Sequence, residues 1–518
     1  MIRAIVISAL LLPWVALDVF GQSSNVALRP LSLRECLGLA LEHNLTVQVE
    51  RLASPEAARY TWKASRGIYD PVLTLNAAKT FLDQPAQFDP KKTGTDAEYE
   101  LESDPVGASL NGRLPYGLQY GLSSVATYAH VFTMFPSNIF NLSGPAFAGF
   151  PDGLRRTNAW FQATEMTLSQ PLLRDFWIDI YSTAIQVNKK YLEIAELTFK
   201  ALVMTNIVAV ETNYYNLIRD REQIRVQQKS LELSSELLRE VRKQVQVGTL
   251  AELDTQQAES AVETARSQLA GAEGAYATAK NVLKNLISEN LQEWMNVDIE
   301  PSENLIAVNV PTDARESWMN ALHSRPDLVA MRLGLEQTNI YMRFFYNQLF
   351  PALNVNGSYG WLEEQHSFSD AFSELRHGAN ANYSAGVTLS VPLGNVTARN
   401  NYKGQKVAKQ QGVLRLNRLQ QDIITEVDNT VKTVQYTYQQ VGATRKAREF
   451  AEAALAAETK RLTAGQVAPF IVLEFQRNVT AARTAEVVAL ADFNRAKAQL
   501  ALSEGTILQQ HKINLKMH

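Results

Sequence analysis

Apolar residues recur at regular spacing along two long stretches of the chain. In the first stretch they fall seven positions apart, at Val210, Leu217, Ile224, Leu231, Leu238 and Val245. Downstream they alternate at four and three positions from Ala258 to Leu286, and they recur at steps of three or four from Ala482 to Leu500. Spacing of this kind, kept over many turns, predicts α-helices packed as coiled coils. The many alanines at these positions indicate helices that approach closely.

Each long helix is predicted to end at a glycine. Gly248 follows Val247, and Gly465 follows Ala464, so either glycine can adopt the left-handed conformation that ends a helix. A helix from near Ile178 to Val247 would be about 105 Å long at the α-helical rise, which exceeds any compact globular domain. We therefore predict two antiparallel helical hairpins in an elongated molecule, over 178–287 and 396–504.

Short segments that alternate between apolar and polar residues predict β-strands. In the clearest segment, apolar Leu353, Val355, Tyr359 and Trp361 alternate with polar and small residues. A soluble sheet with its apolar face inward fits this pattern, and so does a membrane barrel with its apolar face toward lipid. Aromatic residues near the segment ends resemble the girdles of membrane barrels, at Tyr69, Trp160, Phe161, Phe350 and Trp361.

The order of these features occurs twice, which indicates a tandem duplication. Tyr-Asp-Pro-Val-Leu at 69–73 matches Leu-Phe-Pro-Ala-Leu at 349–353, and each begins a strand. Thr-Leu-Ser-Gln-Pro at 167–171 matches Thr-Leu-Ser-Val-Pro at 388–392, and each ends one. We expect a first repeat over 22–300 and a second over 301–518, each with a helix, two strands and a helical hairpin; the C-terminal tail should pack beside the helices.

The two repeats differ in the connection between their strands. The first has a long insertion, 82–163, rich in Pro, Gly, Ser and Asn, which we expect to be extracellular; the second has a short loop, 362–384. Residues 107–131 of the insertion contain a hairpin-like stretch. The pattern alone is compatible with an extracellular loop and with additional strands in the sheet.

Composition narrows the class of protein. The 518 residues carry a net charge of −3 and no basic domain, which argues against nucleic-acid binding. A positive start, an apolar run to Phe20 and small residues after it predict a signal peptide over 1–21. The single cysteine, Cys36, lies too far from that run to be a lipid anchor, so we expect it to be buried in the first helix.

No constellation of catalytic residues is present in the sequence. Its seven histidines show no metal-ligand spacing, and it lacks both nucleophile–base motifs and a phosphate-binding glycine loop. We therefore expect no enzymatic activity, no cofactor and no metal site.

Over about residues 31–510 the sequence resembles the TolC-like outer membrane efflux proteins, also called outer membrane factors. The resemblance rests on the order and duplication of several short features, namely Asn44-Leu45, Arg325-Pro326-Asp327-Leu328, Ser-Gln-Pro-Leu-Leu at 169–173, Ser-Val-Pro-Leu at 390–393 and the two glycine tips. It implies an α+β membrane protein that forms a homotrimer. Each chain would give four strands to a shared 12-stranded barrel in the outer membrane, and its helical hairpins to a tunnel through the periplasm.

Physical chemistry also requires an oligomer for such a sheet, because four strands cannot close a barrel and open sheet edges cannot face lipid. The resemblance further implies a passive exit duct of a tripartite efflux or type I secretion system. Its partners would be outer membrane lipid, a periplasmic adaptor (membrane fusion) protein and, indirectly, an inner-membrane pump.

The resemblance places two acids, Asp254 and Glu474, at the periplasmic mouth of the tunnel. Threefold symmetry would make each acid a ring of three and a candidate cation-sensitive gate. The alternative is that both acids only stabilise the first turns of their helices through the helix dipole. A further acidic position found in some family members is Ile471 here, which indicates a gate that is weaker or differently built.

The resemblance also implies that the hairpin tips dock the adaptor. The candidate residues are Gly248, Thr249, Leu250, Gly465, Gln466 and Val467. The alternative is that they only form the turns.

Two other classes of protein remain open from the residues alone. A periplasmic adaptor also contains coiled-coil hairpins, but it would need a lipoyl-like β-domain, and the duplicated strands argue against it. An exported coiled-coil scaffold or adhesin without a pore would share the long helices.

Overall fold

The computed structural model describes the chain from residue 27, so the predicted signal peptide lies outside the described residues. The described ranges are 27–84, 99–135, 153–309, 313–365, 367, 369–370 and 381–515. The chain divides into two compact units. Unit 1 comprises Met1–Gln48, Thr205–Asp313 and Thr430–Leu502. Unit 2 comprises Val49–Met204, Ala314–Asn429 and Ser503–His518.

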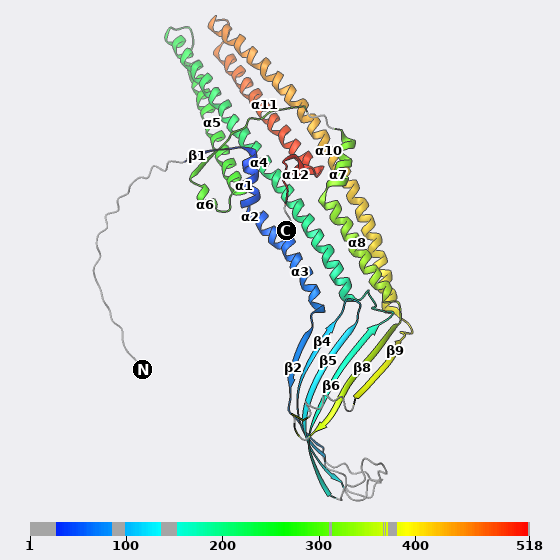
Figure 1. Ribbon diagram of the computed structural model, residues 1–518. Helices are drawn as coiled ribbons and strands as arrows, with labels where there is room; N and C mark the ends of the chain where they lie inside the picture. The colour runs from blue at the N-terminus through cyan, green and yellow to red at the C-terminus, as the bar shows by residue number, and fades with distance from the viewer. Residues whose placement is uncertain are drawn as a thin grey trace, which may run out of the picture. The chain divides into compact units, whose positions relative to one another are not determined.

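Unit 1 is built mainly from two helical hairpins (Figure 1). The first is formed by α4 (Ile180–Gln246) and α5 (Glu252–Ile287), and the second by α10 (Val396–Thr463) and α11 (Pro469–Ser503). Only the parts of α4 and α10 nearest their C-termini belong to this unit. Among the described residues, no helix combines the length and the apolar character that a bilayer-spanning helix requires.

Side-chain hydrogen bonds join α4 to α11 along unit 1. Gln223 Nε2 donates to Thr484 Oγ1 at 3.0 Å, and Thr480 Oγ1 donates to Ser230 Oγ at 3.1 Å. Residue numbers rise along α4 as they fall along α11, so the two helices are antiparallel. Buried alanines, including Ala489 of α11, let the backbones approach closely, as the coiled-coil spacing predicted.

The N-terminal segment of unit 1 pairs with the segment that links the two repeats. Strand β1 (Ala27–Leu31) pairs in parallel with β7 (Val297–Pro301), next to α6 (Leu291–Trp294). The Leu31 carbonyl accepts hydrogen bonds from the Tyr214 hydroxyl at 2.9 Å and from the Ser302 N–H at 3.0 Å. In α1 (Leu33–His43), Cys36 is fully buried, as predicted, and burial raises the pKa of its thiol to about 12.

The helices of unit 2 flank the sheet in sequence in both repeats. They comprise the N-terminal parts of α4 and α10 together with a π-turn (Leu52–Glu56), α3 (Ala57–Ser65), a 3-10 turn (Arg66–Tyr69), α7 (Ala314–Ser324), α8 (Pro326–Asn347) and α12 (Ile507–Gln510). The helix α2 (Leu45–Arg51) lies at the boundary with unit 1.

Arg325, between α7 and α8, ties the second repeat to the C-terminal segment. Its guanidinium binds Asp327 at 2.7 Å and Glu426 at 2.8 Å, and it donates to the Ser503 carbonyl at 3.3 Å. The Arg-Pro-Asp-Leu feature therefore has a structural role.

The sheet of unit 2 is antiparallel, with the order β2-β4-β5-β6-β8-β9 (Figure 1). Its strands are β2 (Val72–Ala77), β3 (Thr80–Gln84), β4 (Tyr99–Arg113), β5 (Gln119–Phe135), β6 (Gly153–Pro171), β8 (Ala352–Gln365) and β9 (Ala381–Ser390). β2 and β3 both pair with β4, one after the other, and the ladder is interrupted beside Pro105, which has no N–H. The seven strands therefore occupy six positions across the sheet.

The two faces of this sheet differ in polarity. One row of register partners is apolar across all six positions, at Leu73, Leu110, Leu122, Met166, Tyr359 and Tyr383. The adjacent row points to the opposite face and is polar or small, at Thr74, Ser109, Ser123, Glu165, Gly360 and Asn382. We call these the apolar face and the polar face. The apolar face is open, with Leu75 74%, Val387 68% and Tyr383 82% exposed.

The number of strands corrects the expectation from the sequence. The four predicted strands are present as β2, β6, β8 and β9, but β4 and β5 lie between β2 and β6. The predicted long insertion, 82–163, is therefore largely strand in its described part, and the undecided stretch 107–131 belongs to the sheet. Its Gly and Pro content resembles a loop, but its side chains continue the alternation of their neighbours.

The predicted short loop, 362–384, is also partly strand. β8 continues to Gln365 by pairing with β6, and β9 begins at Ala381 by pairing with β8, so both strands extend into the predicted loop. Phe161, one of the predicted girdle aromatics, lies on the polar face, since its register partner is Thr127 rather than a residue of the apolar row.

Candidate functional site at the helical tips

The two hairpin tips in unit 1 have the same backbone geometry. Gly248 has φ +81° and Gly465 has φ +71°, a conformation that favours glycine. At the first tip, Thr249 N–H donates to the Gln244 carbonyl and Gly248 N–H to the Val245 carbonyl, each at 2.9 Å. This pair of bonds is the Schellman motif.

The second tip repeats the motif with the same distances. Gln466 N–H donates to the Arg461 carbonyl, and Gly465 N–H donates to the Leu462 carbonyl, each at 2.9 Å. The tip glycines predicted from the sequence are therefore the residues at which α4 and α10 end.

The candidate docking residues divide into exposed and inward-facing positions. Gly248, Thr249, Gly465 and Gln466 are exposed. Leu250 and Val467, which take the same place after their glycines, pack against one apolar cluster shared by both hairpins. We call this cluster the tip core, with buried members Leu237, Val241, Ala258, Ala261, Leu455, Leu462, Val472, Leu473 and Val479. The tip core fixes the two tips side by side.

Asp254 stabilises the start of α5. Its Oδ2 accepts the Ala251 N–H at 3.2 Å, while its own N–H donates to the Ala251 carbonyl at 3.1 Å. The carboxylate is half-buried and lies in the first helical turn, where a negative charge is favoured by the helix dipole. Asp254 therefore caps the N-terminus of α5.

Glu474 has a different environment. It lies one turn deeper than Asp254 when both are counted from the tip glycines, and the position matching Asp254 is Ile471. Glu474 is exposed, and its carboxylate makes no hydrogen bond or ion pair with any residue that the structure describes. The dipole effect falls off after the first turn, so it does not explain this acid.

Two apolar residues at the tips were not singled out from the sequence. Leu253 is 62% exposed in the first turn of α5, and Phe470 is 54% exposed at the matching place in α11. Both repeats therefore expose a large apolar residue at the same place beside the tip. The duplicated offset from each tip glycine could have revealed them.

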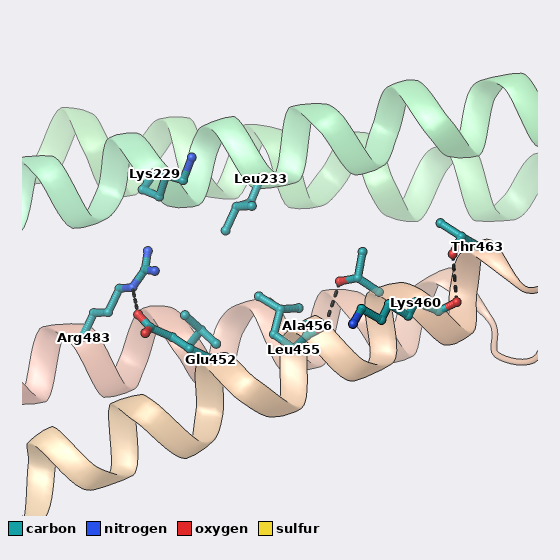
Figure 2. A pocket seen from close by; sticks show the side chains of 10 residues that line it. Lys229, Leu233, Glu452, Leu455, Ala456, Lys460, Thr463 and Arg483 are labelled. Atoms are coloured by element: carbon teal, nitrogen blue, oxygen red, sulfur yellow. Dashed lines mark hydrogen bonds and ion pairs between the residues drawn. The ribbon is translucent and has the colours of Figure 1, made fainter.

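A groove of about 520 Å³ lies near the tips between α4, α10 and α11 (Figure 2). Leu233 and Leu455 point toward one another across it, and Glu452 binds Arg483 at 2.7 Å (Figure 2). Glu452 also binds Arg448 at 3.1 Å, so its charge is already compensated. Among the described residues, no group of three potential metal ligands is found.

Comparison with known proteins identifies the family. The family model described as outer membrane efflux protein matches residues 167–289 and 319–506, which is more than half of the chain. The chain belongs to the outer membrane efflux protein family. No curated protein matches the sequence significantly.

Solved structures share the fold of this efflux protein. The outer-membrane channel OprN aligns with a TM-score of 0.64 and 16% identity, over 92% of this chain and 90% of that chain. The CmeC outer membrane channel of Campylobacter jejuni aligns with a TM-score of 0.64 and 15% identity, over 94% of this chain and 90% of that chain. The outer membrane protein VceC of Vibrio cholerae aligns with a TM-score of 0.63 and 16% identity, over 91% of this chain and 96% of that chain.

These findings confirm the predicted family, the α+β fold class and the location in the outer membrane. The efflux protein is a channel for export and not an enzyme.

The tip geometry generates a prediction about stability. Gly465→Ala forces a side chain into the left-handed region and should lower the free energy of unfolding by about 1 kcal/mol. Gly442→Ala is the matched control, because Gly442 lies inside α10 with open space around it. That change should leave stability unchanged or raise it by up to about 1 kcal/mol. Denaturant unfolding measures both, and equal effects would contradict the assigned tip.

Proposed function

We propose that three copies of this efflux protein form a continuous duct from the periplasm to the outside. The observation that carries the proposal is the two-faced sheet of unit 2. An exposed apolar face backed by a polar face suits a wall between lipid and a water-filled lumen. Its edge strands, β2 and β9, are exposed along their whole length and need partners, since unpaired backbone groups are not tolerated in lipid.

The helical hairpins of unit 1 would line the periplasmic part of the duct. The chain would consist of the tandem repeats 22–300 and 301–518, with residues 1–21 directing export and then removed. Transport would be passive, with cargo delivered by an inner-membrane pump through a periplasmic adaptor of an efflux or type I secretion system. A pore-free scaffold fits less well, because it has no need for the two-faced sheet.

At the periplasmic end, the tips would act as gate and docking site. Glu474 is the stronger gate candidate, because it is exposed, unpaired among the described residues and unexplained by helix capping. Asp254 would add a second ring while also capping α5. The exposed tip backbone around Thr249 and Gln466, with Leu253 and Phe470 beside it, would contact the adaptor.

The proposed duct predicts a trimeric pore. The purified mature chain should lack residues 1–21, run as a trimer that heating dissociates, and conduct ions in planar lipid bilayers. N-terminal sequencing, electrophoresis with and without heating, and bilayer recording test these points. A water-soluble monomer without conductance would overturn the proposal.

The proposed gate predicts sensitivity to charge at the tips. The double variant Asp254→Asn, Glu474→Gln removes both negative charges, while the amide oxygen introduced in α5 can still accept the capping hydrogen bond. The Mg²⁺ concentration that halves the bilayer conductance should rise about tenfold, equivalent to about 1.4 kcal/mol of lost binding. Glu273→Gln, an exposed change far along α5 from the tip, should have no effect. Unchanged block in the double variant would show that these acids do not form the gate.

The proposed docking surface predicts separable effects on binding and conduction. Leu253→Asp with Phe470→Asp should abolish co-purification of the cognate periplasmic adaptor from native membranes, because charges replace both exposed apolar side chains. Bilayer conductance of the same variant should persist, which shows that the duct still assembles. Normal co-purification of the adaptor with this variant would show that Leu253 and Phe470 do not belong to the interface.

A further inference from the structure

The hairpin formed by β4 and β5 changes the size of the barrel. We infer that the efflux protein forms an 18-stranded barrel rather than the 12-stranded barrel that the family resemblance implies. The inference rests on the trimer proposed above, because three copies that each contribute six strand positions give eighteen. The exposed edges of β2 and β9 would each join a second copy of this chain. Four lines of observation carry the inference.

Register shows that β4 and β5 are built into the sheet. All 15 residues of β4 pair with β5, and all 17 residues of β5 pair with β6. No hydrogen-bonded route connects β2 to β6 among the described strands except through these two. A hairpin that projected away from the sheet would instead leave β2 and β6 as neighbours.

In the two rows nearest the helices, β4 and β5 have the same polarity as the other strands. Leu110 and Leu122 continue the apolar row, while Ser109 and Ser123 continue the polar row. On the apolar face of β4, charge begins at Asp104, whose register partner Tyr128 lies 5.2 Å from the ring of Trp160. An aromatic band where charges begin is typical of a membrane interface.

Contacts at the end of the hairpin nearest the helices anchor it within unit 2. Arg113 binds the buried carboxylate of Asp179 at 3.2 Å and lies over the ring of Tyr181. In the β4–β5 turn, Gln170 Nε2 donates to the Tyr116 carbonyl at 3.0 Å, and the Tyr116 ring lies 4.3 Å from that of Trp177.

Gly117 closes this turn with φ +83°. A side chain there would approach the Asp175 carbonyl to 2.9 Å, so the turn is fitted to the segment that follows β6. The β4–β5 hairpin is therefore fixed at its turn, as expected for a pair of strands that belongs to the barrel wall.

Strand direction allows the copies to join. Because the sheet is antiparallel with six positions, its edge strands β2 and β9 run in opposite directions. A β9–β2 junction between copies therefore continues the antiparallel pattern around the barrel. Six strands alone would not enclose a lumen, since even eight strands leave room only for side chains.

The consequence is a wider exit. Barrel diameter grows roughly in proportion to strand number, so an eighteen-stranded barrel is about 1.5 times as wide as a twelve-stranded one and falls in the porin range. The matched family segments, 167–289 and 319–506, do not include β4 or β5.

Site-directed labelling of the full-length protein in outer membranes tests the inference. In a Cys36→Ala background, single cysteines are placed by the changes Leu110→Cys and Leu122→Cys on the apolar face and Ser109→Cys and Ser123→Cys on the polar face. The polar-face cysteines should react with a membrane-impermeant charged maleimide at least about tenfold faster than the apolar-face cysteines. Thr388→Cys and Val387→Cys in β9 provide the matched control pair.

The outcomes separate the inference from the proposed function. If the control pair differs but all four hairpin cysteines react alike, β4 and β5 lie outside the wall and the 18-stranded barrel is wrong while the duct stands. If the control pair also reacts alike, the sheet is not a membrane wall and both proposals fail. Alternation in both sets supports the wider barrel.

Discussion

The structure depends on one constraint, which is that every backbone hydrogen-bonding group of a sheet in lipid must find a partner within protein. Inside one chain the antiparallel ladders from β2 to β9 meet this constraint over most of the inner strands, whereas the two edges have no partner strand in the described part of the chain. Those edges are fully exposed, and the face between them is apolar. A single chain is therefore incomplete in a membrane, and assembly follows from the chemistry of its backbone.

The helical part of the chain satisfies a different requirement. Long helices bury only a stripe of each surface, so their contacts must be close and repeated. Alanine at Ala258, Ala261 and Ala489 allows that approach, and the tip core joins the two hairpins where each turns. The same glycine-centred motif ends both long helices. The two repeats therefore share the pair of backbone hydrogen bonds that caps each helix, as well as their sequence pattern.

Local rules made the helices and tips predictable from the sequence. Gly248 follows unbroken coiled-coil spacing, Gly465 takes the corresponding place in the second repeat, and glycine is the residue that a left-handed cap favours. The four expected strands were equally visible, because an apolar and a polar face alternate within each. The strand pair β4–β5 was left undecided, because Pro105, Gly107 and Gly112 normally signal a loop. Only its pairing with neighbours distant in sequence shows that it is part of the sheet.

The candidate site was predictable in place but not in detail. Asp254 and Glu474 looked alike in sequence, yet one caps a helix and the other is free of described partners, a difference set by a single helical turn. Leu253 and Phe470 were missed because apolar residues in a first helical turn usually face a core. Their exposure depends on how each hairpin is rotated, which the tip core decides.

The most direct test of the account is an electron cryomicroscopy reconstruction of the purified protein in lipid nanodiscs. The account predicts three copies around one axis, with β9 of each copy hydrogen-bonded to β2 of the next inside the lipid. A monomer, or a trimer whose sheet edges stay open or lie outside the lipid, would contradict it.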